Sequence, residues 1–189
     1  MRAIVIYATS EGQTEQIARR IADTMSQSGV PTDTFDITQT NVEGVNVDSY
    51  QAVVLGSSLH FGQHDPRIAN CIEENQRFLK MIPTAFFSVS LGIVSEHAKD
   101  RHEAEWLATE FLQQQRFEPS MKISLAGALR YSRYGWLTKH LMHWIAKKSG
   151  QETDTHHDYE YTDWAAVEDF AARFARHVKS TCESKPILS

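Results

Sequence analysis

The sequence predicts an α/β protein built on a doubly wound, five-stranded parallel sheet with strand order 2-1-3-4-5. Short apolar runs of strand length alternate along the chain with longer stretches whose apolar residues recur at helical spacing. No long antiparallel meander interrupts this alternation, which indicates a parallel sheet with helices on both faces. The 189 residues are enough for one domain whose core needs no disulfide or metal.

Each predicted strand is a short apolar or β-branched run, as expected for strands that are covered on both faces. The predicted strands are residues 2–7, 32–37, 52–56, 84–91 and 123–129. The predicted helices begin near residue 14, at Pro66, at Arg101 and near Trp164, and end near residues 27, 79, 115 and 178. Proline suits the first turn of a helix, and Thr162–Asp163 has the composition of an N-terminal cap.

One stretch, from residue 130 to about 160, is too long to be a plain connection before the last helix. Loops of that length inside a compact domain are usually functional. We therefore expect a single domain over residues 1–180 with an insertion at about 130–160, followed by a disordered tail at 181–189.

Charge is strongly segregated, although the net charge is only −5. Residues 121–150 contain six Lys or Arg and no Asp or Glu, and residues 151–169 contain seven acidic residues and no Lys or Arg. A nucleic-acid-binding domain is usually basic as a whole, so no nucleic-acid partner is expected. A local basic surface on an acidic body fits an anionic ligand or an anionic membrane surface.

Several other classes of protein are disfavoured. The two cysteines, Cys71 and Cys182, have neither metal nor redox spacing, and the nine histidines lack a carboxylate or cysteine complement, so no metal site is expected. The longest weakly polar stretch is much shorter than a spanning helix needs, and the N-terminal apolar run is too short for a signal peptide. These features predict a protein of the cytoplasmic side without a transmembrane segment.

Polar and glycine-containing loops follow three of the predicted strands. In an open parallel sheet, ligands bind beyond the carboxyl ends of the strands, where the strand order reverses. The first loop places hydroxyls and a glycine at the start of a helix, where backbone N–H groups and the helix dipole favour a phosphate. It lacks a P-loop lysine and the G-x-G-x-x-G spacing, so a single terminal phosphate, as in FMN, fits better than ATP or NAD.

These loops supply the candidate cofactor site. The candidate residues are Thr9, Ser10, Glu11, Gly12, Gln13, Thr14, Ser57, Ser58, Leu59, His60, Phe61, Gly62, Ser90, Leu91 and Gly92. The first six would hold the phosphate of FMN, and the others would flank its ring. The alternative for the first loop is an ordinary turn and helix cap without a ligand.

The chain also resembles the flavodoxin-like protoporphyrinogen oxidases, over residues 1 to about 178. The stretches that carry the resemblance are 11–14, 86–89, 126–131, 133–134, 149–155 and 161–164. The resemblance implies a flavodoxin-like fold and FMN-dependent oxidation of protoporphyrinogen IX to protoporphyrin IX in heme biosynthesis, with menaquinone or ubiquinone as electron acceptor. Two other functions of the same fold stay open, a flavodoxin-type electron carrier and an NAD(P)H-dependent quinone reductase. No side chain is nominated as the catalytic acid or base.

The insertion has the pattern of an amphipathic helix from Trp136, with apolar and aromatic residues on one side and basic residues on the other. This composition is typical of a segment that lies at a membrane surface, although an ordinary surface helix is the alternative. The candidate substrate or membrane residues are Arg130, Tyr131, Arg133, Tyr134, Trp136, Lys139 and Trp144. With the resemblance, the two arginines would pair with the propionates of the porphyrinogen, or otherwise with lipid phosphates or nearby carboxylates. We expect peripheral contact with the cytoplasmic side of the inner membrane.

Overall fold

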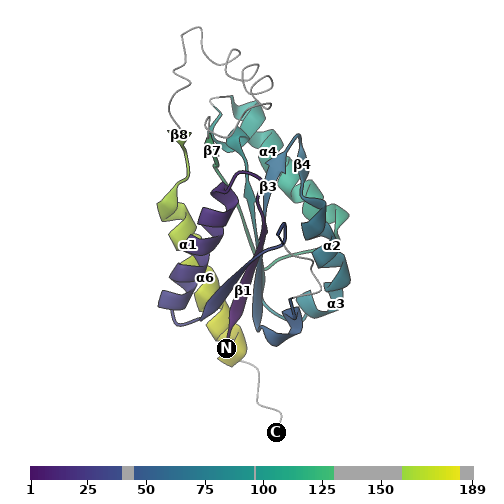
Figure 1. Cartoon of the computed structure of the whole chain (residues 1–189), viewed down its shortest axis with the longest axis vertical. Coiled ribbons are helices and arrows are strands. Elements are labelled where there is room, and N and C mark those ends of the chain that lie inside the picture. The colour runs from purple at the N-terminus through teal and green to yellow at the C-terminus, as the bar shows by residue number, and fades with distance from the viewer. Residues whose placement is uncertain (40–44, 96, 130–158, 184–189) are drawn as a thin grey trace.

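A computed structural model of the chain shows one central parallel sheet (Figure 1). The structure describes residues 1–39, 45–95, 97–129 and 159–183. The strands of the sheet are β1 (Ala3–Ala8), β2 (Thr32–Asp36), β3 (Ala52–His60), β5 (Thr84–Val89) and β6 (Met121–Leu125). They pair in parallel in the order β2-β1-β3-β5-β6, which confirms the predicted order of the five parallel strands.

Helices cover both faces of this sheet. The helices are α1 (Gln13–Gln27), α2 (Pro66–Glu74), α3 (Gln76–Leu79), α4 (Ala98–Gln114) and α6 (Trp164–Glu183), with 3₁₀ turns η2 (Val47–Ser49) and η3 (Leu91–Val94). In Figure 1, α1 and α6 lie together on one side of the sheet and α2, α3 and α4 on the other. No helix within the described ranges combines the length and the apolar composition needed to cross a bilayer.

The alternation of side chains along each strand divides the core into two clusters. In β3, Ala52 and Val54 belong to the cluster that α1 and α6 cover, whereas Val53 and Leu55 belong to the cluster under α2 and α4. Gly56 lies on the same side of the strand as Ala52 and Val54. A Cβ at this position would lie 2.0 Å from the Phe87 ring, so there is no room for a side chain. The sheet is thus buried on both sides, as its nearly continuous apolar strands predict.

The third strand is longer than predicted. It runs to His60 and turns back through Phe61 and Gly62 into β4 (Gln63–His64), which pairs with it antiparallel. Phe61 has φ 50° and Gly62 has φ 77°, values typical of a two-residue hairpin turn. The expectation of a polar loop over residues 57–62 was therefore wrong, because backbone pairing extends the strand although its side chains become polar.

Other boundaries also differ from the predicted ones. β5 ends at Val89 and β6 at Leu125, and the end of the predicted fifth strand forms a separate strand, β7 (Ala128–Leu129). β7 pairs antiparallel with β8 (Tyr159–Glu160), so the described residues on either side of 130–158 are neighbours. The second predicted helix is divided into α2 and α3 at Asn75, whose side chain donates to the Cys71 carbonyl. α6 extends to Glu183, three residues into the expected tail.

Candidate functional site

The predicted loops meet at the carboxyl edge of the sheet, which is the upper end of the molecule in Figure 1. Ala8, the last residue of β1, pairs with Ser57 in β3, and Ser58 pairs with Val89, the last residue of β5. The loop before α1, the β3–β4 hairpin and the Ser90–Gly92 turn therefore leave neighbouring strands. This is the point of reversed strand order at which open parallel sheets bind their ligands.

The loop before α1 is closed by its own side chains. The backbone N–H of Gly12 donates to the Thr9 hydroxyl at 2.9 Å, and Gly12 has φ 87°, in the left-handed region that glycine tolerates best. Gly12 is also the N-cap residue of α1, and no side chain caps the helix there. The N–H groups of the first turn and the positive end of the helix dipole thus face the edge of the sheet without a capping side chain of their own.

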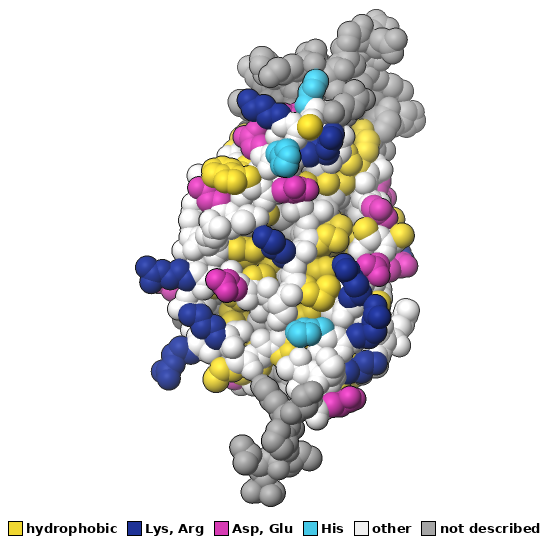
Figure 2. Space-filling model, turned by 180° about the vertical axis from the view of Figure 1, so that it is seen from behind, with side chains coloured by type: hydrophobic (Ala, Val, Ile, Leu, Met, Phe, Trp, Pro, Cys, Tyr) yellow, Lys and Arg dark blue, Asp and Glu magenta, His cyan; other side chains and the backbone are white. Residues whose placement is uncertain are grey.

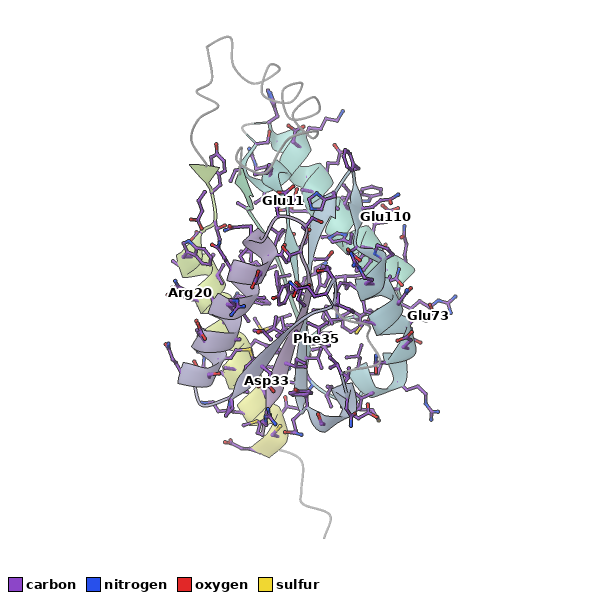
Figure 3. The ribbon with its side chains drawn as sticks, viewed as in Figure 1. Glu11, Arg20, Asp33, Phe35, Glu73 and Glu110 are labelled. Carbon is purple, nitrogen blue, oxygen red and sulfur yellow. The ribbon has the colours of Figure 1, made fainter. Side chains whose placement is uncertain are left out.

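The other residues of this loop differ in exposure. Ser10 is exposed, Glu11 is partly exposed, and Thr14 is buried in the first turn of α1. Glu11 projects near the start of α1 in Figure 3. The carboxylate of Glu15 in the first helical turn is bonded to Arg19 at 2.8 Å, which offsets its charge. The loop therefore offers hydroxyls and backbone N–H groups together with one carboxylate, that of Glu11.

Gln13 also makes contacts that the sequence did not predict. Its side-chain amide donates to the Glu160 carboxylate at 3.1 Å and to the Thr162 hydroxyl at 2.8 Å. Thr162 in turn donates to the Ala126 carbonyl at 3.0 Å. The Gln13 side chain therefore ties the start of α1 to β8 and to the segment that follows it.

The buried side chains of Ser57 and His64 attach the β3–β4 hairpin to the sheet. The Ser57 hydroxyl is fully buried and accepts from the Asp65 N–H at 3.0 Å. His64 is buried against Phe86 and Phe111, and its Nε2 lies 2.9 Å from the Ser88 hydroxyl. Burial lowers the pKa of His64 to about 4, so the imidazole is neutral at physiological pH. These contacts hold the hairpin rigidly at the edge of the sheet.

The tip of the hairpin carries the remaining predicted residues. Leu59 pairs with His64 and His60 pairs with Gln63, which leaves Phe61 at the turn with 69% of its surface exposed. The Nε2 atom of His60 is buried, and no hydrogen-bond partner is found for it among the residues described. A buried polar atom without a partner is rare in a folded protein and calls for an explanation.

The third loop packs tightly on α4. The Ser90 hydroxyl accepts from the Gly92 N–H at 3.1 Å, and a Cβ at Gly92 would lie 3.2 Å from the Ala104 side chain. Leu91 begins η3 and is partly exposed. This turn is closed by its own contacts and borders the hairpin through the β3–β5 pairing.

A neutral phenol, that of Tyr7, lies close to this edge. Tyr7, at the end of β1, is buried, and this burial together with Glu15 and Asp36 raises the pKa of its phenol to about 12.

Behind the hairpin, a cavity of about 370 Å³ lies between β4, α2 and α4, with Glu110 among the residues that line it (Figure 3). The described residues contain no cluster of three or more His, Cys, Asp or Glu that could hold a metal ion.

The predicted substrate or membrane residues Arg130, Tyr131, Arg133, Tyr134, Trp136, Lys139 and Trp144 lie outside the described residues. Most of residues 121–150, the segment with six Lys or Arg and no Asp or Glu, also lies outside the described residues. On the face of the molecule shown in Figure 2, the acidic and basic side chains that are drawn are interspersed. The structure does show that β8, which follows this segment and pairs with β7, is bonded to the start of α1 through Gln13.

Comparisons with known proteins agree on the fold and on a family. A family model described as "Flavodoxin domain" matches residues 4–156. The protoporphyrinogen IX dehydrogenase [quinone] of Escherichia coli K12 is 31% identical over 175 residues, which cover 93% of this chain and 95% of that protein. A protein of the same name from Leishmania major is 33% identical over 92% of this chain and 74% of its own length.

Solved structures support the same architecture. An archaeal flavodoxin superposes with a TM-score of 0.55 at 16% identity, covering 95% of this chain and 99% of its own. A point mutant of a Pseudomonas aeruginosa flavodoxin superposes with a TM-score of 0.58 at 12% identity and the same coverage. At these identities the similarity shows the fold alone.

Proposed function

This chain belongs to the family of quinone-dependent protoporphyrinogen IX dehydrogenases with a flavodoxin domain, and we propose on that basis that it binds FMN and oxidises protoporphyrinogen IX to protoporphyrin IX. A membrane quinone, menaquinone or ubiquinone, is the electron acceptor in this proposal. The observation that carries it is the uncapped start of α1 at Gly12, beside the ends of β3 and β5.

The residues at this edge fit the terminal phosphate of FMN. A phosphate monoester needs several N–H or O–H donors, and it is favoured by the positive end of a helix. The first turn of α1 supplies the N–H groups, and Thr9, Ser10 and Thr14 bring hydroxyls. Gly12 leaves room because it has no side chain. The residues therefore fit the group that the fold implies.

The ring of FMN would lie toward the β3–β4 hairpin and the Ser90–Gly92 turn. Bound FMN supplies the redox chemistry, which takes electrons from the porphyrinogen in pairs and passes them to the quinone. The part of this chain is to bind and orient the cofactor. Because the hairpin is fixed by Ser57 and His64, its tip can hold the ring in one position.

The insertion supplies the substrate and membrane contacts in this proposal. Protoporphyrinogen IX is a large apolar macrocycle with two propionates, and a quinone with a long isoprenoid tail is dissolved in the membrane. The basic and aromatic composition of residues 130–148 suits both, with Arg130 and Arg133 pairing with propionates and the aromatic rings contacting the macrocycle. Peripheral attachment to the cytoplasmic face of the membrane follows from the same composition.

An anaerobic absorption experiment tests this function. The purified protein, loaded with FMN, is mixed with protoporphyrinogen IX without oxygen, and the flavin band is followed before and after a quinone is added. We expect the porphyrinogen to bleach the flavin band and the quinone to restore it. A protein that refuses micromolar FMN, or a flavin that only NADPH bleaches, would contradict the proposal.

A further inference from the structure

His60 carries a polar atom that the described fold does not use. Its Nε2 is buried without a hydrogen-bond partner, and no other side-chain nitrogen or oxygen in the described ranges shares this state. The nearby Asp65 does not supply the missing bond, because its carboxylate is bonded to the Arg67 side chain at 2.7 and 2.9 Å. Leaving a buried polar atom unpaired destabilises a fold, so a partner other than the described residues is expected.

The register of β3 indicates the face on which this side chain lies. Ala52 and Val54 pack in the cluster covered by α1 and α6, and alternate residues of a strand point to the same side. His60 continues this set. Leu59 belongs to the opposite face, in agreement with its pairing partner His64, which packs on Phe86 and Phe111. His60 therefore lies on the side of the sheet from which α1 and its loop rise.

The same register gives the distance from the phosphate loop along the strand. Ser57 is paired with Ala8, after which the loop before α1 begins. His60 is three residues further along β3, which corresponds to about 10 Å of strand. His60 is thus placed beyond the loop, on the part of the hairpin that a ligand anchored by its phosphate would reach with its other end.

The backbone of His60 is held in place by the hairpin. It pairs with Gln63, and the turn that follows contains Phe61 in a left-handed conformation that bulky side chains rarely adopt. Strain of this kind persists where the surrounding structure imposes it, and it is commonest at ligand sites. The imidazole is thereby presented at the edge of the sheet in a defined position.

We propose that His60 Nε2 forms a hydrogen bond with the ring or ribityl portion of FMN, and so positions the cofactor. This inference rests on the proposed function, because it takes FMN as the ligand. An imidazole nitrogen can donate or accept a hydrogen bond, and both kinds of partner occur on the flavin ring and its ribityl chain. Binding of FMN would then satisfy the atom that the described residues leave unpaired.

The test compares His60→Leu with His60→Gln, which retains an amide that can donate and accept, and with His102→Leu, an exposed histidine on α4, as matched control. FMN and riboflavin affinities are measured by quenching of flavin fluorescence, and the stability of each apoprotein by urea unfolding. We expect His60→Leu to weaken FMN and riboflavin by the same factor, about tenfold, without lowering apoprotein stability. His60→Gln should recover part of the affinity, and His102→Leu should match the wild type.

Three results would overturn the inference. One is unchanged flavin affinity in His60→Leu while the wild type binds FMN, which leaves the proposed function intact. Another is a weakening for FMN alone, which would place Nε2 at the phosphate. The third is a loss of apoprotein stability that accounts for the weaker binding, which would make His60 structural. If the wild type itself binds neither flavin, the proposed function fails as well.

Discussion

At the scale of single residues, two glycines occupy equivalent backbone conformations at opposite ends of α1. Gly12 has φ 87° at its start and Gly29 has φ 84° just after its end. A side chain in this left-handed region costs about 1 to 2 kcal/mol. Both positions therefore require a positive φ, which glycine adopts without this cost, but only Gly12 lies at the proposed phosphate site.

We predict that Gly12→Ala and Gly29→Ala each lower the free energy of unfolding of the apoprotein by about 1 kcal/mol, as measured in urea. Only Gly12→Ala should also weaken FMN, because it alters the loop that would surround the phosphate. A Cβ at Gly29 meets nothing within 4 Å, so that variant controls for backbone strain alone. Equal FMN affinities in the two variants would contradict a phosphate site at Gly12.

At the scale of elements, the β3–β4 hairpin depends on a histidine that must stay neutral. Burial lowers the pKa of His64 from 6.5 to about 4, while the unfolded chain keeps the ordinary value. Above pH 6.5 neither state is protonated at this residue. As the pH falls from 6.5 to 4, the unfolded state takes up the proton first, and the folded state loses stability.

We predict that this titration removes about 3 kcal/mol of stability between pH 6.5 and pH 4. In His64→Gln the corresponding slope should disappear, while His102→Gln on the surface of α4 should keep it. The measurement is the free energy of unfolding in urea at several pH values, with each variant compared with the wild type. A His64→Gln protein with the wild-type slope would show that His64 is not the titrating group.

The elements also show where prediction from sequence succeeds and where it stops. The apolar runs of β1 and of the first part of β3 predict those strands, and Asp163 is predicted as a helix cap, which its bond to the Ala166 N–H confirms. The hairpin was missed because Phe61–Gly62 lacks the Asn-Gly signal of a two-residue turn and because Ser57 and Ser58 suggest a loop. Residue propensities favour a loop at residues 57–60, but backbone pairing with β4 and β5 makes them part of a strand.

Long-range contacts were beyond the reach of sequence patterns for a different reason. Gln13 is predicted to bind the cofactor because it lies in the polar loop; its side-chain amide also donates hydrogen bonds to residues 147 and 149 positions away. Nothing in the local sequence of either segment signals this pairing. The unpaired Nε2 of His60 likewise emerges only after the neighbouring residues have been placed, although the position of His60 at the edge was predicted.

At the scale of the whole molecule, the β7–β8 ladder separates the sheet from the insertion. Leu129 pairs with Tyr159 and Ala128 with Glu160, so the two ends of residues 130–158 are neighbours in the backbone. A segment whose ends already meet can be exchanged for a short turn without displacing the rest. The binding of FMN and the handling of the porphyrinogen are therefore expected to be separable.

We predict that replacing residues 130–158 by Asn-Gly, a pair suited to a two-residue antiparallel turn, leaves FMN affinity and the urea midpoint close to those of the wild type. Porphyrinogen oxidation and binding to anionic vesicles should both be lost. Flavin fluorescence, porphyrin fluorescence and vesicle sedimentation measure the three properties. Full turnover in this variant would show that the insertion is dispensable for the substrate.

The packing of α6 on α1 has a consequence for how the chain is made. α1 leaves the ribosome well before α6, the last described helix, yet both cover the same cluster. A nascent chain that lacks α6 therefore leaves exposed the part of this cluster that α6 covers. Chaperone protection during translation would therefore matter most for this half of the core, while the half under α2 and α4 can close earlier.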